Sequence, residues 1–212
     1  MVRSRGALDP TGRSLTDAPA ATEVARLSGS GSGGNVVVVG ESGRARTTAE
    51  LLGAAAELAK SIGGRVVLTT AVVEDWEAIS GQGADRVIRH ADVTGAAEVA
   101  RILASHFTKN PPWAVLAPST AWGREVAARL ATCLGAGLTG DAVGLEVRDA
   151  RLVALKPAFG GRLVAEITCT SPTQMATVRA GVLPVARPRP AGPFGADRLV
   201  PPGGEPLVRV LE

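Results

Sequence analysis

The sequence predicts an α/β protein in which a parallel, doubly wound sheet of the nucleotide-binding type carries a small antiparallel β appendage. Two observations lead to this fold class. Up to residue 134, short apolar runs alternate with longer segments whose apolar residues recur at helical spacing, which is typical of a parallel sheet with right-handed crossovers. After residue 137, short runs are separated only by turns, which favours antiparallel strands.

The first half supplies four expected strands and four expected helices. The run Val36–Val39 is β-branched throughout, which predicts a strand that is buried on both faces. In the next segment, about residues 47–62, Leu51 and Leu58 fall at helical spacing and Gly63 ends the helix. The other expected strands are residues 66–69, 86–90 and 113–117, and the other expected helices are about 75–79, 94–107 and 123–134.

The second half is expected to contain only short strands. They are residues 145–147, 152–155, 163–169 and 175–178, and all four are expected to be antiparallel.

The two ends of the chain differ in composition from its middle. Residues 1–34 have few large apolar side chains and end in a Ser/Gly-rich run, whereas residues 184–212 are rich in Pro and Gly. We therefore expect a flexible tail over 1–34, one domain over 35–183 and a second tail over 184–212, in which residues 207–211 are compatible with an edge strand. The glycines of the first tail precede the first strand, whereas those of a dinucleotide fingerprint follow a strand.

Composition argues against several classes of protein. The chain has three Phe, three Trp and no Tyr, which leaves few rings for stacking bases, and its net charge is only +3. We therefore expect no nucleic-acid partner. The sequence has neither the apolar region of a signal peptide nor an apolar run of membrane-spanning length, so we expect no membrane insertion and a cytoplasmic location.

Few residues have the pattern of a reactive site. His90 and His106 each lack a second ligand at metal spacing, and neither a hydrolase elbow nor a Walker loop follows a strand, so no metal site and no catalytic residue are expected. Cys133 and Cys169 form no paired motif and are expected to be small core residues.

Two loops that follow expected parallel strands are candidate phosphate sites. They are residues 40–43 and the turn that contains Ser119 and Thr120, because open α/β sheets bind ligands at the carboxyl ends of their strands. Glu41 would repel a phosphate, and a helix cap by Ser119 or Thr120 is the simpler interpretation.

Lys156 and Arg179 are candidate contacts to a cofactor. Lys156 begins the run Lys-Pro-Ala-Phe-Gly-Gly, whose glycines allow a planar ligand to approach the backbone. From composition alone, an ordinary hairpin turn with a solvated lysine is the favoured interpretation of this run. Arg179 follows an apolar strand and must find a partner or reach the surface, for example through an ion pair with Glu166.

Four segments together resemble one known family. They are Ser-Thr-Ala-Trp-Gly-Arg-Glu (119–125), Gly-Leu-Thr-Gly-Asp (137–141), Lys-Pro-Ala-Phe-Gly-Gly (156–161) and Gln-Met-Ala-Thr-Val-Arg (174–179). Their order resembles the N-terminal domain of the alpha subunit of electron transfer flavoproteins, over about residues 35–183. The last two segments are most similar to the electron-bifurcating branch, in which an arginine usually stands at the position of Lys156.

The resemblance implies an electron carrier subunit rather than a stand-alone enzyme. Such a subunit forms a heterodimer with a beta-type subunit, frames FAD at the interface and exchanges electrons with a dehydrogenase or other redox partner. The implied cofactor-binding residues are Lys156, Phe159, Gly160, Gly161, Arg179, Ser119 and Thr120. The family's second alpha domain holds FAD through a Gly-Arg-Gly-Val-like segment. Because no such segment occurs here, this domain is expected to be missing, and tight FAD binding by the chain alone is not expected.

A second hypothesis belongs to a different class of function. The chain would then be a free-standing nucleotide-binding or interaction module that has the same fold and carries no electrons. A beta-type subunit encoded beside it would favour the electron carrier.

Overall fold

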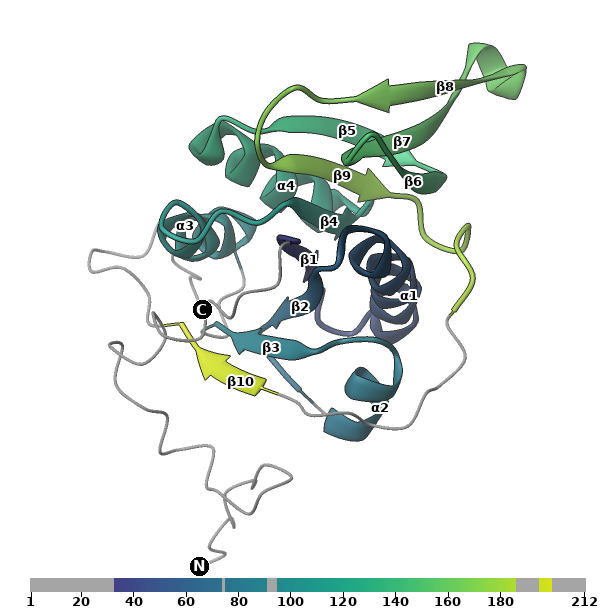
Figure 1. The fold of residues 1–212 in the computed structure, drawn as a ribbon. Helices are drawn as coiled ribbons and strands as arrows, with labels where there is room; N and C mark the ends of the chain where they lie inside the picture. Colours follow the sequence, from purple (N-terminus) through teal and green to yellow (C-terminus); the bar gives the residue numbers. More distant parts are fainter. Residues whose placement is uncertain (1–32, 74, 91–94, 186–194, 200–212) are drawn as a thin grey trace, which may run out of the picture. The chain divides into compact units, whose positions relative to one another are not determined.

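The computed structural model describes residues 33–73, 75–90, 95–185 and 195–199, and it confirms the predicted fold class (Figure 1). A parallel sheet has the strand order β10-β3-β2-β1-β4-β9-β5, and an antiparallel sheet has the order β6-β7-β8. The strands are β1 (Asn35–Val39), β2 (Arg65–Thr70), β3 (Arg86–Arg89), β4 (Ala114–Pro118), β5 (Gly137–Ala142), β6 (Gly144–Arg148), β7 (Arg151–Ala158), β8 (Leu163–Thr168), β9 (Gln174–Val178) and β10 (Gly195–Arg198). The helices are α1 (Ala45–Ile62), α2 (Trp76–Gly81), α3 (Ala96–Phe107) and α4 (Ala121–Leu134), and a 3-10 turn, η2, spans Phe159–Gly161.

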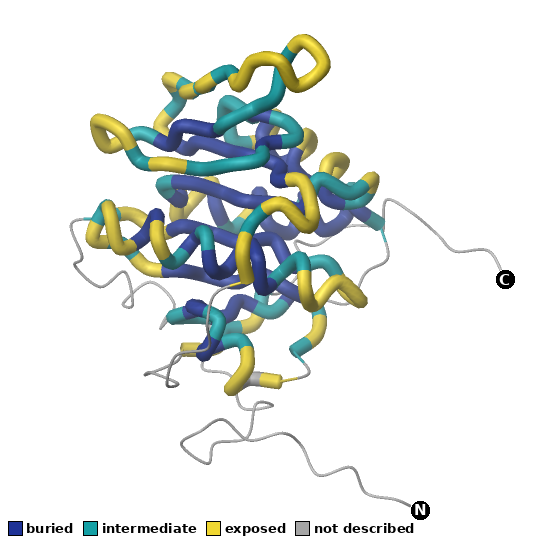
Figure 2. The backbone as a smooth tube through the Cα atoms, turned by 90° about the vertical axis from the view of Figure 1, so that its right-hand side faces the viewer, coloured by how far each residue is buried: buried dark blue, intermediate teal, exposed yellow. Residues whose placement is uncertain are grey.

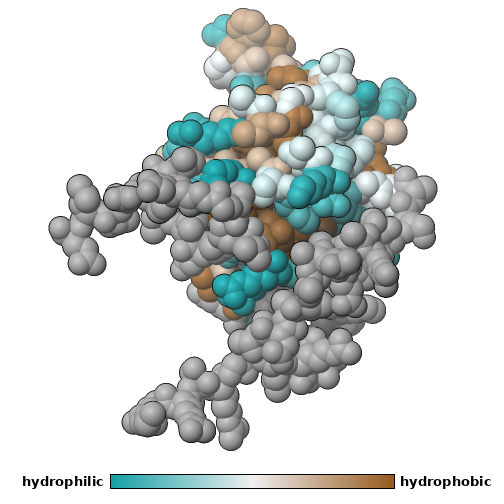
Figure 3. Space-filling model, turned by 90° about the vertical axis from the view of Figure 1, so that its left-hand side faces the viewer, coloured by the Kyte–Doolittle hydropathy of each residue, from teal (hydrophilic) through white to brown (hydrophobic). Residues whose placement is uncertain are grey.

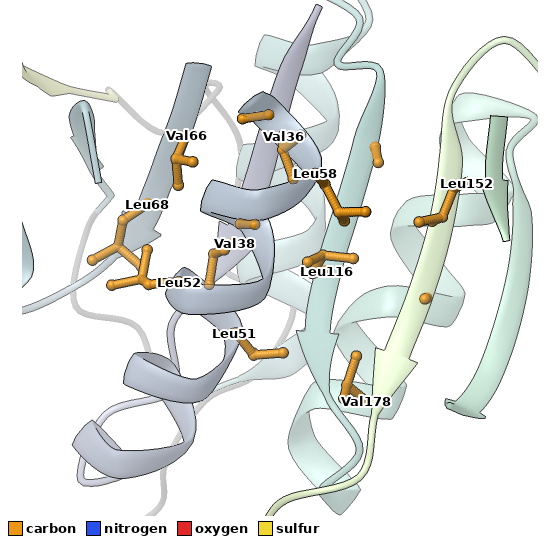
Figure 4. Close-up of a cluster of buried hydrophobic side chains, with 14 of the residues drawn as sticks. Val36, Val38, Leu51, Leu52, Leu58, Val66, Leu68, Leu116, Leu152 and Val178 are labelled. Atoms are coloured by element: carbon orange, nitrogen blue, oxygen red, sulfur yellow. The ribbon is translucent and has the colours of Figure 1, made fainter. Parts of the chain in front are cut away.

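Strand β1 lies at the centre of the parallel sheet, and both of its faces are covered. Val36 and Val38 pack with Leu52 of α1 on one face, as Figure 4 shows. Val37 and Val39 belong to a second cluster on the opposite face, together with residues of α3 and α4. This two-sided burial explains why the strand is an unbroken run of valines rather than an alternation of apolar and polar residues.

The antiparallel sheet shares the α1 side of the core. Leu152 and Ala154 of β7 belong to the same buried cluster as the α1 leucines, and Leu145 of β6 packs against that cluster. Gln174, at the start of β9, is buried, and its Oε1 accepts a hydrogen bond of 3.0 Å from the Leu152 N–H. One side chain therefore links the large sheet to the small one.

Strand β9 corrects the prediction that all strands after residue 137 are antiparallel. It lies between β4 and β5 and is parallel to both, and each of its residues is buried. The meander β6-β7-β8 makes the crossover from β5 to β9, so these two parallel strands are joined without an α-helix. Strand β5 was not expected either, because it contains two glycines and an aspartate, which are uncommon in strands.

Strand β10 is a further element that the sequence does not predict. It pairs with β3 in parallel at the edge of the sheet, and Asp197 forms an ion pair with Arg86. Four residues of the expected second tail thus belong to the sheet, whereas the possible edge strand at 207–211 lies outside the described residues. The domain boundaries after residues 34 and 183 stay predictions.

The two cysteines differ from the expectation that both are core residues. Cys133 is exposed, in the last turn of α4, where the neighbouring Thr132 is exposed as well. Cys169 is half-buried, and its Sγ lies 4.0 Å from the Thr139 Oγ1. In the described part of the chain, no helix is long and apolar enough to span a membrane.

The Gln174 link is open to a direct stability test. Gln174→Leu replaces the glutamine by an apolar side chain of similar size and leaves the buried Leu152 N–H without its acceptor. The free energy of unfolding should therefore fall by about 1–3 kcal/mol. Urea unfolding monitored by circular dichroism measures this difference. The control is Thr132→Ala, which removes an exposed hydroxyl and should change stability by less than about 0.5 kcal/mol. Equal unfolding midpoints for Gln174→Leu and the parent would contradict the proposed role of the link.

Candidate functional site: the polar edge at the ends of the parallel strands

The loops after β1 and β4 meet at the point where the sheet changes its winding direction. The chain leaves β1 for α1 on one face of the sheet and leaves β4 for α4 on the other. Open α/β sheets bind ligands at such a switch point. Here the Thr120 Oγ1 donates a 2.7 Å hydrogen bond to the Glu41 Oε2 and accepts one of 2.9 Å from the Gly123 N–H. Thr120 is therefore the helix cap of α4, and its hydroxyl proton is already donated to the Glu41 carboxylate.

Ser119 lies one residue earlier and is held in a similar way by Asp141 of β5. Its Oγ donates to the Asp141 Oδ1 at 3.0 Å. The Asp141 backbone is left-handed, with φ of 61°, and the pairing of β5 with β9 shifts register between Thr139 and Ala142. Such bulges redirect a side chain out of the regular alternation. Asp141 is thus a residue of this site that the cofactor-binding prediction missed. The signal that could have revealed it is its place directly after a glycine in the segment Gly-Leu-Thr-Gly-Asp.

Arg179 forms the predicted kind of ion pair, but with a different partner. Its Nη2 lies 2.5 Å from the Asp141 Oδ2, and its side chain is about half exposed. Glu166, the acceptor considered from sequence, instead pairs with Arg148 of β6. The hydrogen bond from Arg179 is the main reason why the pKa of the Asp141 carboxyl lies below its usual range, with a smaller contribution from Ser119.

A series of backbone hydrogen bonds connects Ser119 and Arg179 to Lys156. The Ser119 N–H donates to the Val178 carbonyl at 2.7 Å, and the Arg179 N–H donates to the Ala142 carbonyl at 2.9 Å. The next residue, Val143, donates its N–H to the Leu155 carbonyl at 2.8 Å. Residues far apart in sequence are thus brought to one edge, which we call the polar edge: Glu41, Ser119, Thr120, Asp141, Lys156 and Arg179.

Lys156 differs from the other charged residues of the polar edge because no described residue forms an ion pair or hydrogen bond with its side chain. It is half-buried, near the end of β7. Its backbone pairs with Ala165 of β8, and β6 pairs only with Arg151–Leu155 of β7. From Lys156 onward, β7 and β8 therefore continue as a two-stranded hairpin beyond Gly144, the first residue of β6.

The tip of this hairpin is apolar and exposed. Phe159 is 79% exposed, Leu163 60% and Val164 57%. Figure 2 shows the tip as an exposed loop at the top of the view, and Figure 3 shows hydrophobic side chains gathered on it. We call Phe159, Leu163 and Val164 the apolar tip.

The backbone of the tip has three consecutive left-handed residues. Phe159, Gly160 and Gly161 have φ values of 50°, 69° and 84°. A Cβ added at either glycine would meet no heavy atom within 4 Å, so the space beside this backbone is open. For a bulky residue such as Phe159, positive φ is uncommon and strained. The tip therefore leaves bare backbone and one large ring accessible on the same turn.

The charges of the polar edge are not evenly distributed. Glu41 and Asp141 accept the hydroxyl protons of Thr120 and Ser119, and Arg124 donates to the Ser119 and Thr120 carbonyls. The loops that are candidate phosphate sites are thus bordered by two carboxylates and by the Arg124 guanidinium, and Arg179 is bound to the same Asp141 carboxylate. Lys156 lies at the base of the hairpin. Among the described residues, no group of three or more His, Cys, Asp or Glu side chains is placed to hold a metal ion.

Comparisons with known proteins agree with the resemblance seen in the sequence. A family model described as electron transfer flavoprotein domain matches residues 16–196. The chain is 34% identical over 152 residues to an electron transfer flavoprotein subunit alpha of Clostridium acetobutylicum, a match that covers 65% of this chain and 44% of the relative. It is 32% identical over 177 residues to the LctC subunit of the lactate dehydrogenase (NAD(+), ferredoxin) of Acetobacterium woodii, covering 78% and 41% of the two chains.

A FixB protein of Bradyrhizobium diazoefficiens is 43% identical over 76 residues, which are 35% of this chain and 21% of the relative. The chain spans less than half the length of the curated relatives that it matches. Since the family model covers most of the sequence, the chain belongs to the electron transfer flavoprotein domain family.

Proposed function

We propose that this chain is an electron carrier subunit that forms a heterodimer with a beta-type subunit and frames FAD at the shared interface. The observation that carries the proposal is the β7-β8 hairpin, which extends past β6 and combines the apolar tip with Lys156. The family and the names of its alpha-subunit relatives give the proposal its chemistry.

The hairpin has the properties expected of a surface that a partner covers. A two-stranded hairpin is marginally stable in water when it stands alone. The three tip side chains are each more than half exposed, and large apolar side chains exposed together on one turn are typical of interaction sites. A beta-type subunit that packs on the tip would bury these side chains and stabilise the hairpin.

The residues beside the tip fit a planar cofactor that gains negative charge when it is reduced. Gly160 and Gly161 leave the backbone open on one side, so a ring system would have room to approach. Lys156 and Arg179 provide positive charge at the same edge. When bound, FAD would supply the electron chemistry, and the chain's own residues would bind it, orient it and adjust its potential. We expect retention of FAD to need both subunits.

The alternative of a nucleotide-binding module receives less support from the polar edge. A phosphate at the loops of Ser119 and Thr120 would lie beside the Asp141 and Glu41 carboxylates and would compete with them for the two hydroxyl protons. The two carboxylates would repel the phosphate. The cations at these loops already have partners, since Arg124 donates to the Ser119 and Thr120 carbonyls and Arg179 is paired with Asp141. As the electron partner we propose a dehydrogenase or another redox enzyme, and the cytoplasm as the place of action.

The first prediction concerns assembly. The purified chain should be colourless, and mixing it with FAD and the beta-type subunit of the same organism should give a yellow one-to-one heterodimer. Phe159→Ala should weaken the heterodimer at least about tenfold, since exposed aromatic anchors often contribute 2 kcal/mol or more to an interface, which is about 30-fold in affinity. Analytical ultracentrifugation with flavin absorption measures both effects.

The control for assembly is Val72→Ala, which shortens an exposed apolar side chain outside the hairpin and should leave the affinity unchanged. A yellow, stably monomeric chain that holds one FAD would refute the proposal.

The second prediction concerns Lys156. A unit charge about 4 Å away at an effective dielectric of about 20 is worth roughly 4 kcal/mol, which is at most roughly 170 mV for one electron. Solvent and side-chain motion should reduce this effect to some tens of mV. Because a positive charge stabilises the reduced flavin, Lys156→Ala should lower the flavin potential of the heterodimer. Lys156→Arg should keep or raise it, since the guanidinium holds the same charge in a more rigid fork.

Spectroelectrochemistry of the heterodimer gives these potentials. Lys109→Ala, which removes an exposed lysine after α3, is the matched control and should not change them. Identical potentials in the parent and both Lys156 variants would place this side chain in solvent and make the turn an ordinary hairpin.

A further inference from the structure

Asp141, near the end of β5, contacts the ends of two other strands, β4 and β9. Its backbone N–H donates to the buried Thr177 Oγ1 of β9 at 2.9 Å, while its carboxylate accepts from Ser119 after β4 and from Arg179 after β9. The left-handed backbone at the β5 bulge is what turns this carboxylate toward the edge. An aspartate in a strained conformation that makes this many specific contacts is a candidate for a functional role.

The main chain around Arg179 is fixed independently of its side chain. The Arg179 N–H is bound to the Ala142 carbonyl, and two residues later the Gly181 N–H donates a 2.7 Å hydrogen bond to the Glu50 Oε2. Glu50 is buried in α1, with Arg46 at 3.5 Å from its other carboxylate oxygen. Because both sides of the residue are anchored, the direction of the Arg179 guanidinium depends mainly on its own bond to Asp141.

The ion pair leaves part of the guanidinium available. An arginine carries five N–H groups in a planar fork. Arg179 uses Nε, at 3.4 Å, and Nη2 toward Asp141, and within the described ranges no residue accepts a hydrogen bond from its Nη1. Asp141 also offsets the arginine's charge, so Arg179 is better suited to directed hydrogen bonding than to acting as a net positive charge. Lys156, for which no residue in the described part of the chain provides such a partner, is suited to the second task.

We propose that Asp141 is a positioning residue that orients Arg179 so that its Nη1 side donates to the flavin framed at the subunit interface. This inference rests on the proposed function. It assigns separate roles to the two cations: Arg179 supplies a directed hydrogen bond, and Lys156 supplies net charge.

The test uses Asp141→Asn, because asparagine tolerates the left-handed backbone and keeps the size of the side chain while it removes the charge. Arg179→Gln and the double variant complete a mutant cycle. The flavin potential of each heterodimer is measured by spectroelectrochemistry. In the chain alone, the NMR signal of the Arg179 Nε–H reports whether the guanidinium is held.

Positioning and direct charge predict shifts of opposite sign. Removing a negative charge by itself raises the flavin potential, whereas losing the orientation of Arg179 lowers it. We therefore expect Asp141→Asn to lower the potential in the parent and to raise it in the Arg179→Gln background. An equal upward shift in both backgrounds would overturn the inference, because Asp141 would then act through its own charge alone.

Two further variants keep the outcome interpretable. Glu166→Gln breaks the Arg148 ion pair, which has the same 2.5 Å length and similar exposure, and should leave both the potential and the Arg179 signal unchanged. Arg179→Lys keeps the charge but removes the fork, so its potential should fall toward that of Arg179→Gln. A potential equal to that of the parent would overturn the inference even if Asp141→Asn does not fold.

The proposed function and the positioning role fail in different ways. If no flavin-containing heterodimer forms, the proposed function is wrong, and the positioning role is judged in the chain alone. Loss of the slowly exchanging Arg179 Nε–H signal in Asp141→Asn would then support it, and an unchanged signal would overturn it.

Discussion

The pairing of β9 on both of its edges is the constraint on which the rest of the structure depends. The strand bonds to β4 on one side and to β5 on the other, and no residue in it is exposed. A parallel partner on each side forces the chain between β5 and β9 to return to the starting edge, and the meander β6-β7-β8 makes that return. The small sheet is therefore the crossover connection of the large one. Its strands β7 and β8 continue past β6 as the exposed hairpin.

The position of β9 also determines which side chains meet. Its first residue, Gln174, fixes the small sheet through Leu152, and its last backbone carbonyl, at Val178, accepts from Ser119. Arg179 follows directly and reaches Asp141 at the bulge of β5. A single buried strand thus places a link between the sheets at one end and a charged cluster at the other, so the polar edge is a consequence of the same pairing that forms the core.

Much of the fold was predictable from the sequence because it depends on local pattern. The valine run of β1 and the helical spacing of the α1 leucines indicate their elements without knowledge of the rest. Strand direction in the second half was not predictable in this way, because a short apolar run such as β9 reads alike in a parallel and an antiparallel sheet. Strands β5 and β10 were missed for a related reason: their residues have low β-propensity, and only tertiary pairing holds them in the sheet.

The candidate site shows the same division between local and tertiary information. Ser119, Thr120, Lys156 and Arg179 stand out in sequence as polar residues beside strands. Where the structure gives one of them a side-chain partner, that partner is 22 to 79 residues away, as for Ser119 with Asp141 and Thr120 with Glu41. From sequence, Glu166 was one example of a partner for Arg179, whereas in the structure the bulge of β5 supplies the Asp141 carboxylate and Glu166 pairs with Arg148. An arginine held by a carboxylate is chemically different from a lysine that no described carboxylate contacts. That difference arises only when β5 and β9 lie side by side.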